Sequence, residues 1–219
     1  MRINKWLAQA TGLSRRAADR AVQAGRVTIN GRRAVVGDEV ADDAVSLDGK
    51  SVRPGKTVTI MLNKPVGYVC SRQGQGSQTI YDLLPDEYHQ LKPVGRLDKD
   101  SSGLLLLTND GDLANRLSHP RYVKTKVYEV SLDRALAPSD RDLISRQGVQ
   151  LEDGPSKLAL RQLRDERHWQ IEMHEGRNRQ IRRTFAALRY KVVSLNRTHF
   201  GDHQLGDLPS GKWTRLSSA

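Results

Sequence analysis

The chain is poor in cysteine and lacks long apolar runs. Cys70 is the single cysteine among 219 residues, which excludes an internal disulfide framework. No Cys/His cluster has metal-ligand spacing, and no cofactor motif is present, so we expect neither a metal nor a cofactor. No apolar run approaches the ~18 residues needed to span a bilayer. Residues 1–6 lack the apolar segment of a signal peptide, so we expect a cytoplasmic protein without membrane contact.

Acidic residues are scarce relative to basic ones. The chain contains 36 Lys and Arg residues against 25 Asp and Glu, a formal net charge of +11. A basic surface gains free energy by releasing condensed counterions from phosphates, so this excess indicates a polyanionic partner. Charge alone also fits a basic protein without such a partner. Its distribution favours the first interpretation, because residues 1–33 hold eight Lys or Arg and one acid, Asp19.

The basic N-terminal stretch has the pattern of a small domain with helices and β-strands. Apolar residues first recur at helical spacing: Ile3, Leu7 and Ala10. Ser14 is a suitable N-cap for a second helix over residues 15–24, which Gly25 is placed to end. Apolar residues then alternate as in short strands: Val27, Ile29, Val45 and Leu47. Asn30 and Gly31 form a strong signal for a type I′ turn.

This stretch resembles the S4-like RNA-binding domain. The resemblance rests on residues 2–7, 14–18 and 25–31, and it covers about residues 1–48. It implies a rigid basic face that grips the backbone of folded RNA by shape, with little readout of bases. The residues that it marks for RNA binding are Arg2, Lys5, Ser14, Arg15, Arg16 and Arg26. The alternative is a solvated, charged helix face.

The rest of the chain predicts a second, larger domain. Residues 49–57 contain Pro and Gly among polar residues and are predicted to be a flexible linker. Residues 58–219 mix strands and helices. Strands are predicted over residues 58–62, 127–132, 169–173 and 191–195, and helices over residues 111–117, 138–147 and 177–188. We therefore expect two domains, 1–48 and 58–219.

The most informative motif is a polar loop over residues 95–103 that runs into the four leucines of residues 104–107. A loop held against a buried strand is a rigid mount for a reactive side chain. Asp98 and Asp100 are the candidate acids, although Asp100 also suits a simple turn. From the residues alone, a charged turn before a core strand and a catalytic acid are equally good interpretations.

The motif Gly-Arg-Leu-Asp, followed by Ser-Gly-Leu-Leu, resembles the signature of pseudouridine synthases, specifically the RsuA-like ribosomal branch. The resemblance implies that Asp98 is the catalytic residue. It also implies that Tyr128, in a Lys-x-Tyr strand, stacks on the target uracil. Arg182, in a Gln-Ile-Arg segment, would pair with Asp98 and keep it ionised. The alternative for Tyr128 is an ordinary strand aromatic.

The same resemblance assigns further contacts. Substrate binding falls on Arg96, Leu195 and Lys64, and RNA binding on Arg177, Arg179 and Arg183. Leu195 would be an apolar wall for the uracil, or else a core strand residue. Thr184 departs from the family, which more often has a hydrophobic residue there, and this leaves the local packing open.

The implied fold class is α+β, with a small S4-like domain and a larger domain built on a mixed, largely antiparallel sheet flanked by helices. Asp98, Tyr128 and Arg182 would converge from three segments on a cleft in that sheet.

The implied activity is isomerisation of one uridine in ribosomal RNA, with the large subunit preferred as the source. The target base would be flipped out of the RNA helix. Asp98 would either attack covalently or remove the C2′ proton, and the sequence does not separate these routes.

Two other kinds of protein remain as alternatives. A non-catalytic RNA-binding or ribosome-assembly protein would use both basic regions as grips. A hydrolase would use two carboxylates with distinct roles, for which Asp98 and Asp100 are candidates. Structured ribosomal RNA is the expected partner, and a monomer is the default expectation.

Overall fold

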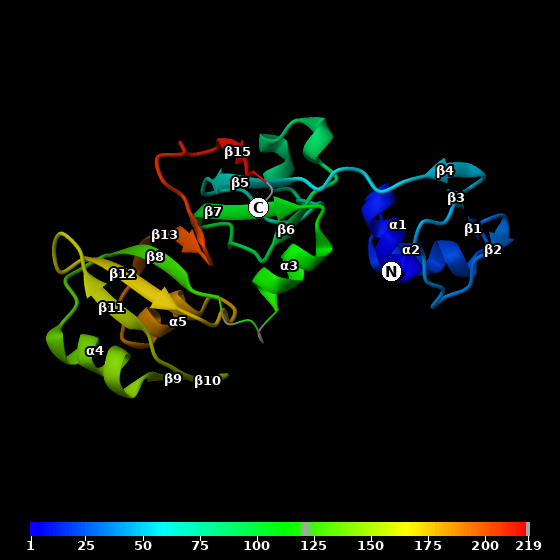
Figure 1. Ribbon diagram of the computed structural model, residues 1–219. Helices are drawn as coiled ribbons and strands as arrows, with labels where there is room; N and C mark the ends of the chain where they lie inside the picture. The colour runs from blue at the N-terminus through cyan, green and yellow to red at the C-terminus, as the bar shows by residue number, and fades with distance from the viewer. Residues whose placement is uncertain (120–121, 123, 218–219) are drawn as a thin grey trace.

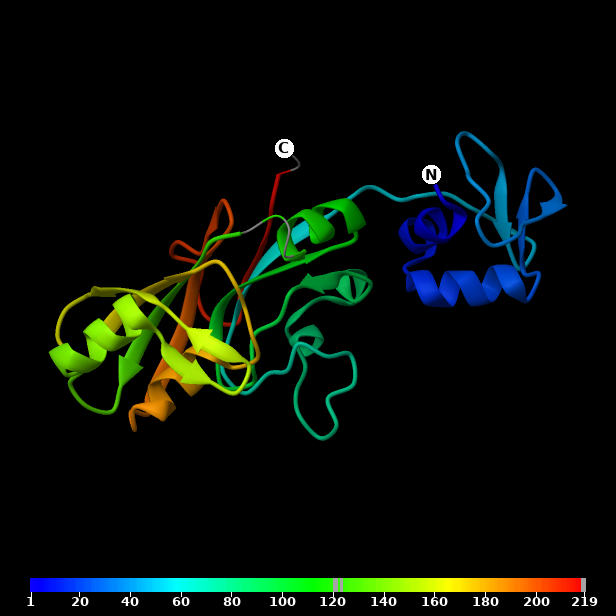
Figure 2. The ribbon, with the colours of Figure 1, turned by 90° about the horizontal axis from the view of Figure 1, so that it is seen from below.

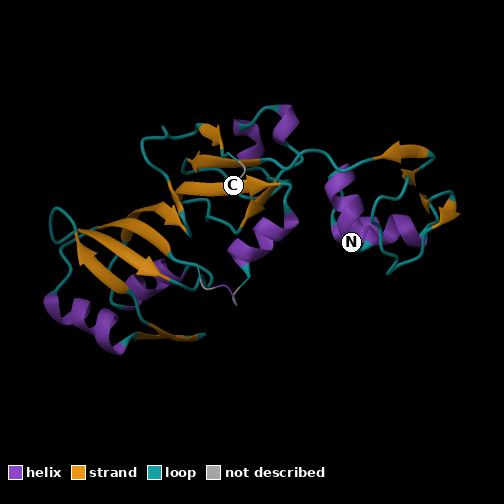
Figure 3. Ribbon diagram, in the orientation of Figure 1, coloured by secondary structure: helices purple, strands orange, loops and turns teal. Residues whose placement is uncertain are grey.

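The computed structural model describes residues 1–119, 122 and 124–217 of the chain. Figure 1 shows two bodies joined by one extended stretch of chain, with the smaller body at the N-terminus. We call residues 1–52 the N-terminal region and residues 58–217 the C-terminal region. Figure 3 shows helices beside short strands in the first, and a broad sheet with helices on its faces in the second.

The N-terminal region follows the predicted pattern. Its elements are α1 (Ile3–Thr11), α2 (Arg15–Gln23), β1 (Val27–Ile29), β2 (Arg32–Arg33), β3 (Val45–Leu47) and β4 (Lys50–Val52). Ser14 caps α2, because its side chain accepts a hydrogen bond from the Ala17 amide. Asn30 and Gly31 both have positive φ, as a type I′ turn requires. The strands form an antiparallel sheet in the order β2-β1-β3-β4, and the apolar sides of helices and sheet share one core.

One prediction for this region is corrected. Residues 50–52 were predicted to lie in a linker, but they form β4 and pair with β3. Asp48 and Gly49 both take positive φ and make the tight turn between these strands. The connection to the C-terminal region therefore begins after Val52.

The C-terminal region is built on one large sheet. Its elements, in chain order, are β5 (Thr59–Lys64), η1 (Ile80–Leu83), η2 (Asp86–Tyr88), β6 (Lys92–Val94), β7 (Ser102–Thr108), α3 (Gly111–Ser118), β8 (Lys126–Leu132), α4 (Pro138–Asp142), η4 (Leu143–Gln147), β9 (Val149–Leu151), β10 (Gly154–Ser156), β11 (Ala159–Gln162), β12 (His168–Met173), α5 (Gln180–Ala187), β13 (Val192–Phe200), β14 (His203–Gln204) and β15 (Trp213–Arg215). The main strand order is β11-β12-β8-β13-β7-β5-β15, with β14 on β13 and β6 on β7. The β13–β7 pair is parallel and its neighbours are antiparallel, so the predicted mixed α+β fold is confirmed.

The four-leucine run occupies the centre of this sheet. Leu105 and Leu107 pack into the larger core, while Leu104 and Leu106 pack into a second core on the opposite face. Side chains of a strand alternate between faces, so a strand covered on both faces must be apolar at every position. Figure 2 shows α3 on one side of the sheet and α5 with α4 on the other.

The predicted helix over residues 177–188 begins three residues late. Arg177 and Asn178 lie in a loop, and Arg179 has φ +47° at the N-cap of α5. The sequence runs polar and charged through these positions, so it carries no strong start signal. Because the helix begins at Gln180, Arg177 and Arg179 do not point in the directions that a helix starting at residue 177 would give them.

Candidate active site

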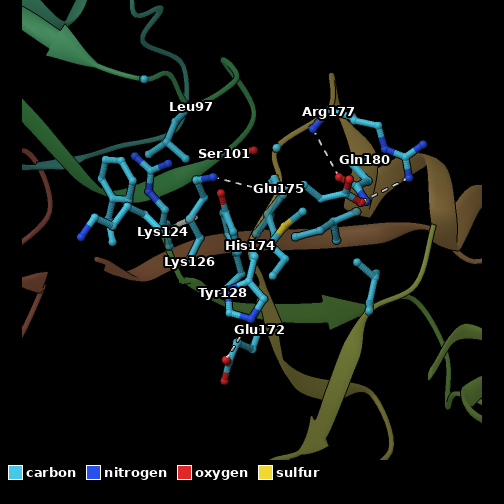
Figure 4. A pocket seen from close by; sticks show the side chains of 18 of the residues that line it. Leu97, Ser101, Lys124, Lys126, Tyr128, Glu172, His174, Glu175, Arg177 and Gln180 are labelled. Atoms are coloured by element: carbon cyan, nitrogen blue, oxygen red, sulfur yellow. Dashed lines mark hydrogen bonds and ion pairs between the residues drawn. The ribbon is translucent and has the colours of Figure 1, made fainter. Parts of the chain in front are cut away.

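A cavity of about 1120 Å³ opens where the loop before β7 meets β8, β13 and the start of α5. Asp98, Tyr128 and Leu195 all line it, as do Arg96, Arg177 and Arg179. Figure 4 shows Leu97 and Ser101 from the loop, Lys126 and Tyr128 from β8, and Arg177 with Gln180 near the start of α5. Segments distant in sequence thus converge on one concave site.

The loop that carries Asp98 is fixed through its backbone. The carbonyl oxygens of Asp98 and Ser101 accept hydrogen bonds from the Lys64 Nζ, at 3.1 and 2.7 Å. The Leu97 side chain is buried, and the Cys70 thiol contacts the Leu97 carbonyl and amide, at 3.3 and 3.4 Å. The Ser101 amide closes the turn onto the Asp98 carbonyl oxygen. The Asp98 side chain therefore projects from an anchored backbone, as a preorganised site requires.

The two acids of the loop have different surroundings. The Asp100 carboxylate accepts two hydrogen bonds from Arg179, at 2.9 and 2.8 Å, and lies 3.2 Å from the Arg182 Nε. The hydrogen bonds from Arg179 lower the pKa of Asp100, and the charge of Arg182 adds to this effect. Asp98 lies 3.6 Å from an Arg179 nitrogen and is 34% exposed. Asp98 lines the cavity and Asp100 does not.

The predicted partner of Asp98 is corrected. Arg182 makes its ion pair with Asp100, and it donates hydrogen bonds to the carbonyl oxygens of Asp100 and Val192. Within the described chain, the basic residue paired with Asp98 is Arg179, which the sequence assigned to RNA binding. The physical reason is the left-handed turn at Arg179, which starts α5 at Gln180 and brings Arg179 to the cavity.

Lys64 is also placed differently from its prediction as a substrate-binding residue. Its side chain is fully buried, and Nζ donates to three carbonyl oxygens, of Pro65, Asp98 and Ser101. These three bonds use every N–H of the ammonium group, and burial lowers the pKa of Lys64. The residue supports the loop from beneath and does not line the cavity.

Tyr128 and Leu195 lie on neighbouring strands. Both are less than 10% exposed, and both belong to the larger core as well as to the cavity wall. Each therefore packs in the core and also faces the cavity. Arg96, in contrast, is exposed at the same cavity.

The predicted RNA-binding arginines at the start of α5 all hold protein groups. Arg177 and Arg183 both bind the Asp153 carboxylate, at 3.0 and 2.6 Å. Arg177 also donates to the carbonyl oxygens of Gly154 and Pro155. These contacts attach the β9–β10 hairpin to the start of α5. Thr184 belongs to the same network, because its buried hydroxyl donates to Ser156 or Gln180, which resolves the packing of this polar residue.

In the N-terminal region, two of the predicted RNA-binding residues pair with acidic side chains. Arg2, Arg15 and Arg16 are exposed. Lys5 pairs with Asp112 of α3 at 2.7 Å, and Arg26 pairs with Asp48 through two hydrogen bonds. No helix in the described part of the chain is long and apolar enough to cross a bilayer.

Among the cavity-wall residues that sequence reasoning did not assign to the site are Ser101 and Arg197. Arg197 follows Leu195 by two positions on β13, so the two side chains share a face of the sheet. A basic residue in phase with core residues was the signal that could have identified it. Ser101 gave no such signal, since serine is common in loops.

Comparison with known proteins agrees with this architecture. Residues 58–187 match the RNA pseudouridylate synthase family model, and residues 1–44 match the S4 domain model. The chain belongs to the RNA pseudouridylate synthase family, and it carries an S4 domain. Members of this class are isomerases that act on RNA, and the predicted activity class is confirmed.

Individual relatives extend over nearly the whole chain. An uncharacterized RNA pseudouridine synthase of Aquifex aeolicus (strain VF5) is 41% identical over 99% of this chain and 90% of the relative. Ribosomal large subunit pseudouridine synthase B of Bacillus subtilis (strain 168) is 35% identical, over 99% and 92%. The dual-specificity RNA pseudouridine synthase RluF of Escherichia coli (strain K12) is 34% identical, over 99% and 76%. A crystal structure of a pseudouridylate synthase aligns with a TM-score of 0.71 at 32% identity, over 99% and 96%.

Proposed function

We propose that the chain isomerises one uridine of large-subunit ribosomal RNA to pseudouridine, with Asp98 as the catalytic residue. The observation that carries this proposal is the Asp98 carboxylate at a cavity shared with Tyr128 and Leu195. Asp100 is occupied by two arginines, which leaves one acid of the loop for chemistry. The Bacillus relative, named for the large ribosomal subunit, supports the choice of RNA.

The reaction breaks the N1–C1′ bond of uridine and forms a C5–C1′ bond, while N1 gains a proton and C5 loses one. The atoms of substrate and product are the same, so no redox partner or energy donor is consumed. The target base must leave the RNA stack to enter a cavity, at a cost of a few kcal/mol. Stacking on Tyr128 and contact with Leu195 would offset this cost, and Arg96 at the exposed rim would fill the space that the base leaves.

Asp98 then either forms a covalent bond to the nucleotide or removes the C2′ proton. Both routes need an ionised carboxylate. Arg179, with a nitrogen 3.6 Å from the Asp98 carboxylate, limits the positions that this carboxylate can take. Arg182 would act on Asp98 indirectly, through Asp100. It pairs with the Asp100 carboxylate and donates a hydrogen bond to the Asp100 carbonyl oxygen.

We propose a division of labour between two domains. The N-terminal region has its own apolar core, which supports its assignment as an S4-like RNA-binding domain. The C-terminal region, from residue 58, would be the catalytic domain. Arg2, Arg15 and Arg16 would contact the RNA backbone from the first, with the remaining predicted basic residues supporting them.

The test is pseudouridine mapping of ribosomal RNA in cells that lack the protein. One site should disappear in the deletion, return with the wild-type protein, and stay absent with Asp98→Ala or with the isosteric Asp98→Asn. Purified Asp98→Asn should still bind RNA, because no phosphate contact is lost. An unchanged map would favour the non-catalytic RNA-binding alternative. Full activity of Asp98→Asn would refute the assignment of the catalytic residue.

A further inference from the structure

Three buried donors of the cavity wall have no acceptor in the described part of the chain. One is the Nε of Arg177, whose other side-chain nitrogens bind protein groups, and the other two belong to Arg197 and Ser101. Arg197 on β13 is 2% exposed, and the hydrogen bond of its side chain joins Nε to the Leu104 carbonyl oxygen, at 2.8 Å. The Arg197 Nη2 atom is buried and unpaired. The hydroxyl of Ser101, which is 1% exposed, is in the same condition. Folded proteins pair the large majority of buried hydrogen-bond donors. The donors of Arg197 and Ser101 therefore indicate an acceptor supplied from outside the chain.

The donors of Arg197 and Ser101 lie close to the residues of the proposed reaction. Sheet register sets Arg197 opposite Tyr128 of β8 on one side and Gly103 of β7 on the other. Ser101 precedes Gly103 by two positions and follows Asp98 by three. Figure 4 includes Ser101 and Tyr128 among the residues around this pocket. A group that binds both donors would therefore belong to the nucleotide that enters the cavity.

The charge of the wall indicates what kind of group this is. Seven Lys or Arg residues line the cavity against three Asp or Glu. Arg197 has no ion pair within 4.0 Å among the residues described, although a buried guanidinium normally has a carboxylate partner. Its guanidinium carbon lies 4.8 Å from the centroid of the Phe200 ring, a weaker attraction that brings no negative charge. Burial and then repulsion from Arg197 lower the pKa of the neighbouring Lys126. A neutral acceptor would satisfy the N–H groups, but it would leave this positive charge uncompensated.

We propose that Arg197 and Ser101 bind a phosphate that flanks the target uridine. This inference rests on the proposed function, because it takes the flipped nucleotide as the occupant of the cavity. Phosphate oxygens accept charge-assisted hydrogen bonds from a guanidinium, and a hydroxyl can donate to the same group. The contact would fix the sugar next to Asp98 while Tyr128 holds the base. Arg197 is thus a substrate-binding residue. Neither the sequence motif around Asp98 nor the ion pair between Asp98 and Arg179 involves it.

The target uridine is first identified as the one that the wild-type protein converts in transcribed large-subunit ribosomal RNA. The test then uses single-turnover kinetics on a synthetic RNA stem-loop that contains this uridine. The phosphates on the two sides of this uridine are replaced, one at a time, by a neutral methylphosphonate. One replacement should lower kcat/KM of the wild-type protein about 10- to 100-fold, as expected for the loss of a hydrogen bond to a charged group. Arg197→Gln should lower it by a similar factor on unmodified RNA. The combination should add little to either change alone.

Arg161→Gln is the matched control, because Arg161 is an exposed arginine of β11 that binds Gln170. It should leave kcat/KM unchanged on every RNA. The proposal is overturned if neither methylphosphonate slows the wild-type protein, a result that does not depend on whether Arg197→Gln folds. It is also overturned if the methylphosphonate penalty is equal in the wild-type protein and Arg197→Gln. If the wild-type protein converts no uridine at all, the proposed function fails, and the phosphate site fails with it.

Discussion

At the residue scale, the loop before β7 separates two acids that the sequence presents as equals. Asp98 and Asp100 stand two positions apart, but Asp100 binds Arg179 and Arg182 while Asp98 lines the cavity. The difference follows from the backbone, because Lys64 holds the carbonyl oxygens of Asp98 and Ser101 and so fixes the direction of each side chain. The spacing of Asp98 and Asp100 in the sequence does not reveal where each side chain points.

The Asp100 ion pairs predict a pH-dependent contribution to stability. Arg179 and Arg182 lower the pKa of Asp100 in the folded protein below the ordinary value of 3.8. The stabilisation is therefore complete above pH 3.8, and it is lost as the pH falls through the folded pKa. Because Asp100 is 44% exposed, solvent screening limits it to about 1 kcal/mol. Urea denaturation should show Asp100→Asn less stable than wild type at pH 7, with the difference shrinking below pH 4.

The control for this measurement is Asp42→Asn, which changes an exposed acid of the N-terminal region. It should show no comparable difference between pH 7 and pH 3. A destabilisation by Asp100→Asn that stays constant down to pH 2 would mean that the carboxylate charge is not what matters there.

Lys64 gives a second prediction at this scale. Lys64→Met keeps most of the buried volume but removes the donor from three carbonyl oxygens. Unpaired buried acceptors should cost about 3 kcal/mol of unfolding free energy. The loop should also lose its fixed geometry, so kcat should fall while RNA affinity changes little. Chemical denaturation and single-turnover rates together check this, and a normal kcat for Lys64→Met would exclude a positioning role for Lys64.

At the scale of elements, the sequence predicted those whose pattern repeats along the chain. The amphipathic spacing of α1 and α2, the turn at Asn30–Gly31 and the four-leucine run of β7 each follow a local rule, and the structure confirms them. What failed depends on tertiary contacts. The strand β4 exists because β3 offers an edge to pair with, and the start of α5 at Gln180 depends on the left-handed Arg179. The ion pairs of Arg179 and Arg182 with the acidic loop depend on that start, so the sequence did not predict which acid each arginine contacts.

The parallel pairing of β7 with β13 depends on a glycine. Gly103 has φ +105°, and a Cβ atom there would overlap the backbone nitrogen and oxygen of Arg197. Backbone atoms in the middle of a sheet cannot move away, so Gly103→Ala should separate the strands that carry the loop and Arg197. We expect loss of cooperative thermal unfolding, or a large drop in Tm, with complete loss of activity.

Gly111→Ala is the matched control for that substitution. Gly111 begins α3, has nothing within 4 Å of the added Cβ and does not have a positive φ. Alanine is the better helix former by up to about 1 kcal/mol, so this variant should be as stable as wild type or slightly more stable. Equal melting temperatures for the two variants would contradict the close approach at Gly103.

At the scale of the whole molecule, the N-terminal region touches the C-terminal region at few points. Lys5 pairs with Asp112 at the start of α3, and Lys92 donates to the Leu13 carbonyl oxygen at 2.9 Å. The first contact uses a lysine that the sequence assigned to RNA. The exposed Arg15 and Arg16 on α2 are therefore better placed than Lys5 to meet an RNA backbone.

Removal of these two arginines should change how RNA binding depends on salt. If each neutralises one phosphate, Arg15→Ala with Arg16→Ala should lower the slope of log K against log salt by about 1.5 and weaken binding at low salt. The comparison variant is Arg141→Ala with Arg146→Ala, which removes the same charge from exposed positions in the α4–η4 helix, far from the N-terminal region in Figure 1. Fluorescence anisotropy of labelled ribosomal RNA fragments from 50 to 300 mM salt, about the range where such contacts weaken, measures both slopes. Equal slopes for the two variants would mean that net charge alone attracts the RNA, whereas a change confined to the α2 variant locates the RNA backbone on the N-terminal region.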